Sequence, residues 1–167
     1  MQLGMIGLGR MGANIVRRLM RDGHECVGFD VNQDAVQAIV ADGATGASDL
    51  QNFVSKLQTP RVIWLMVPAG LTGSIVEQVA DLLDEGDIVI DGGNSNYRDD
   101  VRRAAAMRER GIEYVDAGTS GGVRSARRPR MRPHLEGEQC HMRALAAGAL
   151  PAITHVRDHG NANRRET

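Results

Sequence analysis

The sequence predicts an α/β fold with a parallel, doubly wound sheet. Short apolar runs typical of buried strands alternate with longer segments that repeat apolar residues with a helical period. The run 61–67, RVIWLMV, is apolar almost throughout, as in a strand buried on both faces of a parallel sheet. A glycine turn of the form G-x-G-x-x-G joins the first expected strand to the first expected helix. Together these three observations favour a Rossmann-like arrangement.

Each expected element has local support. The first helix, which reaches Arg21, repeats apolar residues on one face, and Asn32 and Ser48 are suitable N-caps for the next two helices. Gly43 and Pro68 are suitable ends for the second helix and the fourth strand. The strands are expected at 2–6, 25–29, 44–47, 61–67, 87–90 and 112–115, and the later helices at 33–41, 48–57, 71–83 and 97–110.

The glycine turn carries the first functional signal. Gly7 allows the tight turn, Gly9 lets a pyrophosphate approach the backbone, and Gly12 lets the helix pack closely on the strand. The free N–H groups at the helix start favour negative charge. The second strand ends in Asp30, about 20 residues later, as the dinucleotide fingerprint requires. The alternative is a glycine-rich turn that only packs a helix on a sheet.

Asp30 predicts which dinucleotide binds. A carboxylate at this strand end can accept hydrogen bonds from the adenosine ribose, and it would repel a 2′-phosphate. No arginine or lysine follows at 31–33 to neutralise that phosphate, so we expect NAD rather than NADP. The alternative is that Asp30 only caps the next turn. Arg10, inside the glycine turn, either contacts a phosphate or is simply solvated.

Three further loops are expected at the carboxyl ends of strands, where such sheets bind their ligands. They are 68–70, 92–95 and 119–122, all rich in small or polar residues. Asn94 offers a donor and an acceptor for a carboxamide or a sugar hydroxyl, or else is a turn residue. Ser120, Gly121 and Gly122 offer a hydroxyl and backbone N–H groups for an anion, or else form a flexible loop.

No catalytic group is evident. The sequence shows no Ser-His-Asp or Cys-His arrangement, and His24 is expected to be solvated in a turn away from the cleft. The only lysine, Lys56, is expected at the amino edge of the sheet. The predicted fold therefore holds a dinucleotide without an evident general base.

Composition excludes several classes of partner. The formal net charge of −1 gives no bulk attraction to nucleic acid. No signal-peptide pattern opens the sequence, and no apolar run is long enough to span a membrane. Cys26 and Cys140 are too few for a disulfide framework or a zinc site. We therefore expect a cytoplasmic protein without nucleic-acid, membrane or metal partners.

The motifs resemble one family. GLGRMG at 7–12, MVPAG at 66–70, DGGNS at 91–95 and DAGTSGG at 116–122 are similar to the N-terminal domain of 6-phosphogluconate dehydrogenase, most closely its short NAD-preferring bacterial form. The resemblance covers 1–123. It implies oxidation of 6-phosphogluconate by NAD, with loss of CO2 to give ribulose 5-phosphate and without a metal. Alternatives are another β-hydroxyacid dehydrogenase or a non-catalytic dinucleotide-binding module.

The resemblance also implies roles for single residues. Asn94 would contact both nicotinamide and substrate, and Ser120, Gly121 and Gly122 would hold the sugar acid. The cofactor would be held by Gly7, Leu8, Gly9, Arg10, Met11, Gly12 and Asp30, with Val67, Pro68 and Ala69 beside its ribose and nicotinamide.

The composition changes sharply after Val123. Residues 124–167 hold nine arginines and four of the five histidines but no aromatic residue, and their net charge is +5, against −6 for 1–123. The family continues instead with a helical domain that supplies the lysine base, the glutamate acid and the dimer interface. We therefore expect a dinucleotide-binding domain at 1–123 that lacks turnover alone, and a basic tail at 124–167.

Three interpretations of the tail stay open. It is a product of a shifted reading frame, a basic arm for nucleic acid, or an ordinary disordered tail. Any helix in it would be short, because Gly148 and Pro151 interrupt its apolar residues. The resemblance also implies a further strand after the sixth, and without that strand the sixth would keep an exposed edge.

Overall fold

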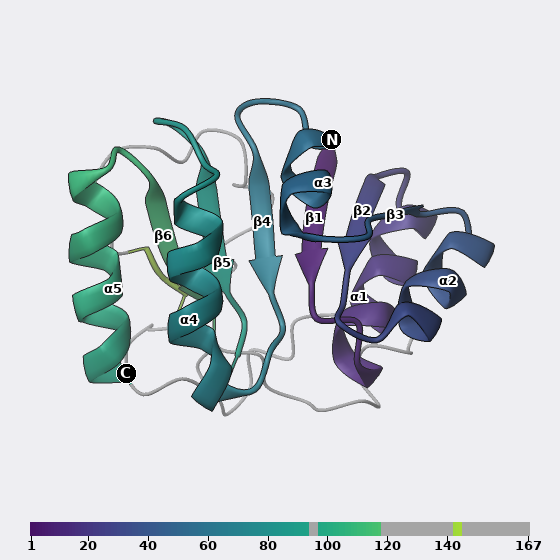
Figure 1. The fold of residues 1–167 in the computed structure, drawn as a ribbon, viewed down its shortest axis with the longest axis horizontal. Coiled ribbons are helices and arrows are strands. Elements are labelled where there is room, and N and C mark those ends of the chain that lie inside the picture. The colour runs from purple at the N-terminus through teal and green to yellow at the C-terminus, as the bar shows by residue number, and fades with distance from the viewer. Residues whose placement is uncertain (94–96, 118–141, 145–167) are drawn as a thin grey trace, which may run out of the picture.

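The computed structural model describes residues 1–93, 97–117 and 142–144 and contains one seven-stranded sheet (Figure 1). The strand order is β3-β2-β1-β4-β5-β6-β7, and every neighbouring pair is parallel except β6 and β7. Its first six strands follow the Rossmann order 3-2-1-4-5-6, which confirms the predicted fold class. The strands are β1 (Gln2–Ile6), β2 (Glu25–Phe29), β3 (Thr45–Gly46), β4 (Val62–Leu65), β5 (Ile88–Asp91), β6 (Glu113–Ala117) and β7 (Met142–Ala144).

Helices cover both faces of the sheet. The helices contribute to two separate hydrophobic core clusters. One cluster holds Val16 and Val36 from α1 and α2, and the other holds Phe53, Val76 and Met107 from α3, α4 and α5. Figure 1 shows α4 and α5 in front of β5 and β6. The bounds are α1 (Arg10–Arg21), α2 (Gln33–Ala41), α3 (Leu50–Ser55), α4 (Ala69–Ala80) and α5 (Tyr97–Glu109).

The strand order reverses between β1 and β4. These strands pair in register from Gly4↔Ile63 to Ile6↔Leu65, so their carboxyl ends lie at the same edge of the sheet. From β1 the chain winds outward to β2 and β3, and from β4 it winds the other way to β5 and β6. Ligands of doubly wound sheets bind in the crevice that such a reversal leaves between the loops.

Several predicted boundaries differ from the structure. The expected strand 61–67 is shorter, Val62–Leu65, and the expected helix 71–83 begins and ends earlier, at Ala69 and Ala80. The third helix is capped by Asp49 rather than Ser48. The Asp49 carboxylate accepts the Asn52 N–H at 2.7 Å, while the Ser48 hydroxyl donates to Asp49. Aspartate is as good an N-cap as serine, and here it has the extended backbone that a cap needs.

The outer edge of β6 was expected to be exposed, but in the structure it is paired with another strand. β7 pairs with it antiparallel, from Val115↔Ala144 to Ala117↔Met142. The tail at 124–167 was expected to hold at most a short helix. Its described part is instead the three-residue strand β7. The rest of the expected tail, 124–141 and 145–167, lies outside the described residues.

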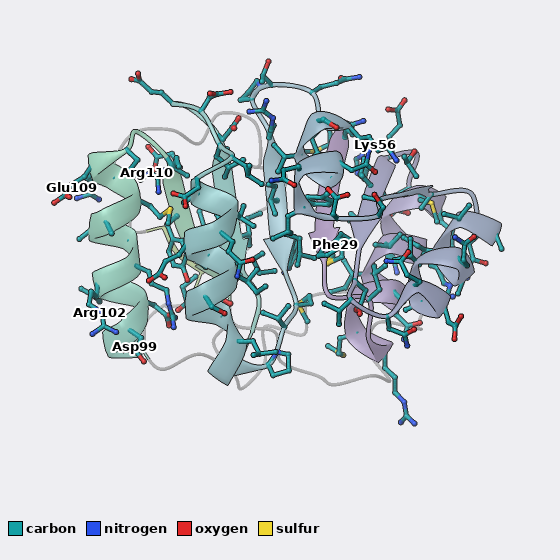
Figure 2. All side chains as sticks on the ribbon, viewed as in Figure 1. Phe29, Lys56, Asp99, Arg102, Glu109 and Arg110 are labelled. Atoms are coloured by element: carbon teal, nitrogen blue, oxygen red, sulfur yellow. The ribbon has the colours of Figure 1, made fainter. Side chains whose placement is uncertain are left out.

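The outer face of α5 is charged, as expected. Asp99, Arg102 and Glu109 lie on the outer side of the helix (Figure 2), and Arg102 Nη2 is 2.9 Å from Asp99 Oδ1. Lys56 lies at the opposite end of the sheet from the strand carboxyl ends, also as expected, and its ammonium donates to the Gly46 carbonyl at 2.7 Å. Among the described residues no helix is long and apolar enough to cross a membrane.

Candidate functional site

The glycine turn between β1 and α1 is tightly built. Gly7 has a φ of 93°, a left-handed conformation that favours glycine, and its N–H donates to the Phe29 carbonyl at 2.9 Å. A Cβ at Gly12 would overlap the Gly7 carbonyl oxygen, so only glycine lets α1 approach the turn this closely. A Cβ at Gly9 would meet nothing within 4 Å. The geometry thus separates two structural glycines from one that faces open space.

The start of α1 is open to an anion. Gly9 is its N-cap and has no side chain to occupy the first N–H groups, and no acidic residue lies in the first turn. Helix N-termini with such free donors attract negative groups such as phosphates. Arg10 is exposed beside this turn and lines the same cleft, so both of its predicted roles stay open.

Asp30 connects two loops at this site. Its Oδ2 accepts the Leu8 N–H at 2.6 Å, and its Oδ1 accepts the Asn32 N–H at 2.8 Å. Asp30 therefore does more than cap the turn after β2, because it also anchors the glycine turn. Each carboxylate oxygen has two acceptor positions, so the group can still receive hydroxyl donors from a sugar.

A cleft of about 660 Å³ runs along the carboxyl ends of the strands. Its volume is in the range of small-molecule and cofactor sites. The lining comes from the last residues of β1 and β2, from the loops after β1, β2, β4 and β5, and from the first two turns of α1 and α4: Ile6, Gly7, Gly9, Arg10, Met11, Gly12, Phe29, Asp30, Val31, Met66, Val67, Pro68, Ala69, Leu71, Ile75, Gly92 and Gly93.

Most of the described residues predicted for the cofactor line this cleft. Leu8 differs: its side chain is 4% exposed and packs in the core, so only its backbone, through Asp30, belongs to the site. Asn94, Ser120, Gly121 and Gly122 lie outside the described residues, and their roles stay predictions.

The sequence did not predict three apolar residues that line the cleft. Val31 is 88% exposed at the mouth of the cleft, and Leu71 and Ile75 line it from α4. The spacing of Leu71 and Ile75, four residues apart, places them on one helix face and was the available signal. The spacing alone did not reveal that this face borders the cleft, because that depends on where α4 (Ala69–Ala80) lies relative to the other loops.

A family model for the NAD binding domain of 6-phosphogluconate dehydrogenase matches residues 2–146. The chain belongs to this family. YqeC of Bacillus subtilis (strain 168), provisionally named a 6-phosphogluconate dehydrogenase, is 47% identical over 127 residues, which are 76% of this chain and 43% of that protein. The NAD(+)-dependent decarboxylating 6-phosphogluconate dehydrogenase of Haloferax volcanii is 45% identical over 127 residues, 75% of this chain and 42% of the relative.

A solved structure has the same fold. The 6-phosphogluconate dehydrogenase of Plasmodium falciparum, studied with NADP+ and with 6-phosphogluconate, superposes with a TM-score of 0.71 at 26% identity, over 76% of this chain and 29% of that one. The chain therefore spans less than half the length of these 6-phosphogluconate dehydrogenase relatives. The match extends past Val123, and the domain boundary expected there stays a prediction.

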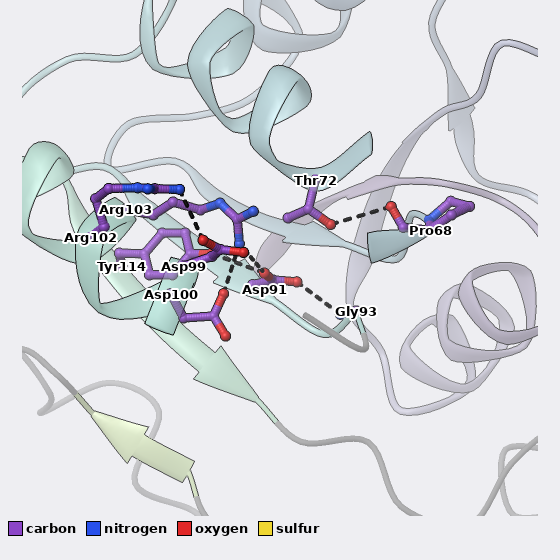
Figure 3. A network of polar contacts seen from close by, with 9 residues as sticks. All are labelled: Pro68, Thr72, Asp91, Gly93, Asp99, Asp100, Arg102, Arg103 and Tyr114. Carbon is purple, nitrogen blue, oxygen red and sulfur yellow. Dashed lines mark hydrogen bonds and ion pairs between the residues drawn. The ribbon is translucent and has the colours of Figure 1, made fainter. Parts of the chain in front are cut away.

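A buried polar network joins α5 to strands β5 and β6 of this NAD-binding domain (Figure 3). The Tyr114 hydroxyl donates to Asp91 Oδ2 at 2.9 Å, and Arg103 Nη1 is 2.8 Å from Asp100 Oδ1. Asp91 and Asp100 are buried, with 0% and 2% of their surface exposed. Burial raises the pKa of Asp100, and Arg103 opposes this only in part. Sequence reasoning did not assign these residues, which come from three different elements.

Tyr114 gives the fold a specific response to alkaline pH. Burial, followed by the facing Asp91 carboxylate, raises the pKa of Tyr114 above its usual value, and Asp100 adds to this while Arg103 opposes it. The unfolded chain therefore loses this proton at lower pH than the folded chain, so stability falls as the pH rises above about 10. Between about pH 8 and pH 10.5 we expect the wild type to lose about 1 kcal/mol more than Tyr114→Phe. Urea denaturation at each pH tests this, and equal losses would contradict it.

Among the described residues, the titratable groups that line the cleft are Arg10 and Asp30. His24 is only partly exposed, and its Nδ1 is buried without a hydrogen-bond partner, so the expectation that it is simply solvated is wrong. Within 1–93, 97–117 and 142–144, no three His, Cys, Asp or Glu side chains gather as a metal site would need.

Proposed function

We propose that the cleft binds NAD and that the chain is the dinucleotide-binding domain of a decarboxylating 6-phosphogluconate dehydrogenase. One observation carries this proposal: the glycine turn and the Asp30 carboxylate are joined directly, by the Leu8 N–H, at the mouth of one cleft. A turn that only packed a helix would not need this link to the end of β2. The family match and the NAD(+)-dependent relative support the same function.

The residues present fit a dinucleotide. Gly9 leaves open space beside the uncapped start of α1, which suits a pyrophosphate. Asp30, held by two backbone donors, suits the hydroxyls of the adenosine ribose. Val67, Pro68 and Ala69 follow the neighbouring strand β4 and suit the nicotinamide half.

The chemistry of the bound cofactor is hydride acceptance from an alcohol. The chain itself binds and orients that cofactor: the glycine turn holds the phosphates, and Asp30 fixes the adenosine end. Contacts with 6-phosphogluconate through Asn94, Ser120, Gly121 and Gly122 are part of the proposal. So are the lack of turnover by this chain alone, an oligomeric parent enzyme and a cytoplasmic location.

Asp30 should make the site prefer NAD. We expect isothermal titration calorimetry to show NAD binding at least about tenfold tighter than NADP, because a 2′-phosphate would face the fixed carboxylate. Asp30→Asn keeps the size but removes the charge, and it should reduce this preference about tenfold. Asp42→Asn removes a carboxylate from the far end of α2, where it pairs with Arg17, and should leave the preference unchanged.

The outcomes separate the parts of the proposal. Equal or tighter binding of NADP by the wild type would overturn the preference for NAD. Binding of neither dinucleotide by the folded wild type would overturn the dinucleotide site itself.

A further inference from the structure

We propose that Tyr114, acting through the Asp91 carboxylate, positions the Gly92–Gly93 wall of the cleft and so controls how tightly the nicotinamide half of the cofactor binds. The inference rests on the proposed dinucleotide function. It assigns a positioning role to a tyrosine that does not line the cleft.

The contact between strand and loop is direct. Asp91 is the last residue of β5, and its Oδ1 accepts the Gly93 N–H at 2.9 Å. Its Oδ2 accepts the Tyr114 hydroxyl, also at 2.9 Å, from the neighbouring strand β6. Figure 3 shows the chain of contacts that runs from Tyr114 through Asp91 to Gly93. One buried carboxylate thus ties a fixed ring to a backbone N–H in the cleft wall.

The carboxylate is also held electrostatically. Arg103 Nη1 on α5 lies 4.0 Å from Asp91 Oδ2, and both side chains are largely buried. In such surroundings a charge is costly unless it is paired and hydrogen-bonded. Asp91 therefore has a strong preference for the orientation in which Tyr114, Arg103 and Gly93 all face it.

The Gly92–Gly93 wall has little room to move relative to the Asp91 carboxylate. The Gly92 N–H donates to the Leu65 carbonyl at 2.9 Å, which fixes the start of the loop. A Cβ on Gly93 would lie 3.1 Å from the Val67 carbonyl oxygen and 3.6 Å from Thr72 Oγ1, so the loops after β4 and β5 abut. A shift of Gly93 would therefore change the cleft beside Val67.

The strand order places this wall far from the adenosine end. Asp30 follows β2, the glycine turn follows β1, and Gly92 follows β5. In the sheet, β4 lies between β1 and β5. Three strand spacings separate β2 from β5, roughly 14 Å. A dinucleotide with its adenosine ribose at Asp30 and its pyrophosphate at the glycine turn directs its nicotinamide half toward Gly93.

Tyr114→Phe tests the role, because it keeps the ring and removes only the donor to Asp91. NADH contains both halves of the cofactor, whereas ADP contains the adenosine half and the pyrophosphate. We expect NADH to bind about five- to tenfold more weakly to the variant, while ADP affinity changes less than about twofold. NADH fluorescence reports the nicotinamide surroundings directly, and calorimetry gives the ADP affinity. Loss of protein stability alone would weaken both ligands or neither.

Two further variants test the same contact and control for a loss of stability. Asp91→Asn preserves the size but not the charge, and it should shift the NADH-to-ADP affinity ratio in the same direction. Arg61→Gln breaks an ion pair with Asp87 at the opposite, amino edge of the sheet, where Nη1 is 2.7 Å from Oδ2. It should lower stability and leave the ratio unchanged.

Each outcome decides one question. An unchanged ratio in folded Tyr114→Phe and Asp91→Asn, or an equal loss of both ligands, overturns the positioning role while the dinucleotide site stands. Failure of the wild type to bind either NADH or ADP overturns the proposed function and this inference together.

Discussion

Gly12→Ala is expected to lower the free energy of unfolding by about 3 kcal/mol, the largest stability effect among the changes considered. The added methyl group would overlap the Gly7 carbonyl oxygen, which is backbone and cannot rotate away. That carbonyl is held in place, because the Gly7 N–H donates to Phe29 and the left-handed φ of Gly7 fixes the turn. Helix α1 must therefore move away from the strand, with loss of packing around Val16.

Urea denaturation followed by circular dichroism measures this effect, with Gly9→Ala as the matched control. Both variants add one methyl group to the same turn, but a Cβ at Gly9 meets nothing within 4 Å. The φ of Gly9 is −58°, which alanine adopts without strain. We expect a change below about 1 kcal/mol for Gly9→Ala, since a modest loss at the N-cap is offset by lower entropy of the unfolded chain. Equal destabilisation by the two variants would contradict the packing role of Gly12.

The glycine turn could be predicted because its determinants are local. Gly7, Gly9 and Gly12 lie within six residues of one another, so their spacing can be recognised without the fold. The parallel sheet was equally accessible, because the apolar run at 61–67 needs no partner to be recognised as a buried strand.

What the sequence did not reveal depends on contacts between distant positions. The sequence could predict that Asp30 contacts the hydroxyls of a sugar. The hydrogen bond from the Leu8 N–H to Asp30, however, joins residues 22 positions apart and appears only in the fold. Tyr114 and Asp91 are 23 positions apart and meet because β5 and β6 are neighbours in register. The pairing of β7 with β6 crosses an even longer separation. A tyrosine in an apolar strand is typical of a core residue, so nothing local marked Tyr114 as a donor to a loop anchor.

Gly9→Ala is expected to weaken NAD binding by tenfold to about a hundredfold, the largest effect on binding. The methyl group would occupy the open space beside the first turn of α1, where the pyrophosphate of the proposed dinucleotide would approach the backbone N–H groups. Loss of a hydrogen bond to a charged group corresponds to a change of that size. Calorimetry with NAD and with ADP measures it.

Because NAD and ADP both carry the pyrophosphate, Gly9→Ala should weaken them by the same factor. Tyr114→Phe should instead affect only ligands that contain the nicotinamide half. The two variants therefore test the two ends of the cleft separately within one folded domain. Unchanged affinity for both ligands in Gly9→Ala would mean that the phosphates do not lie at the start of α1, and the assignment of this cleft to a dinucleotide would fail even with the fold intact.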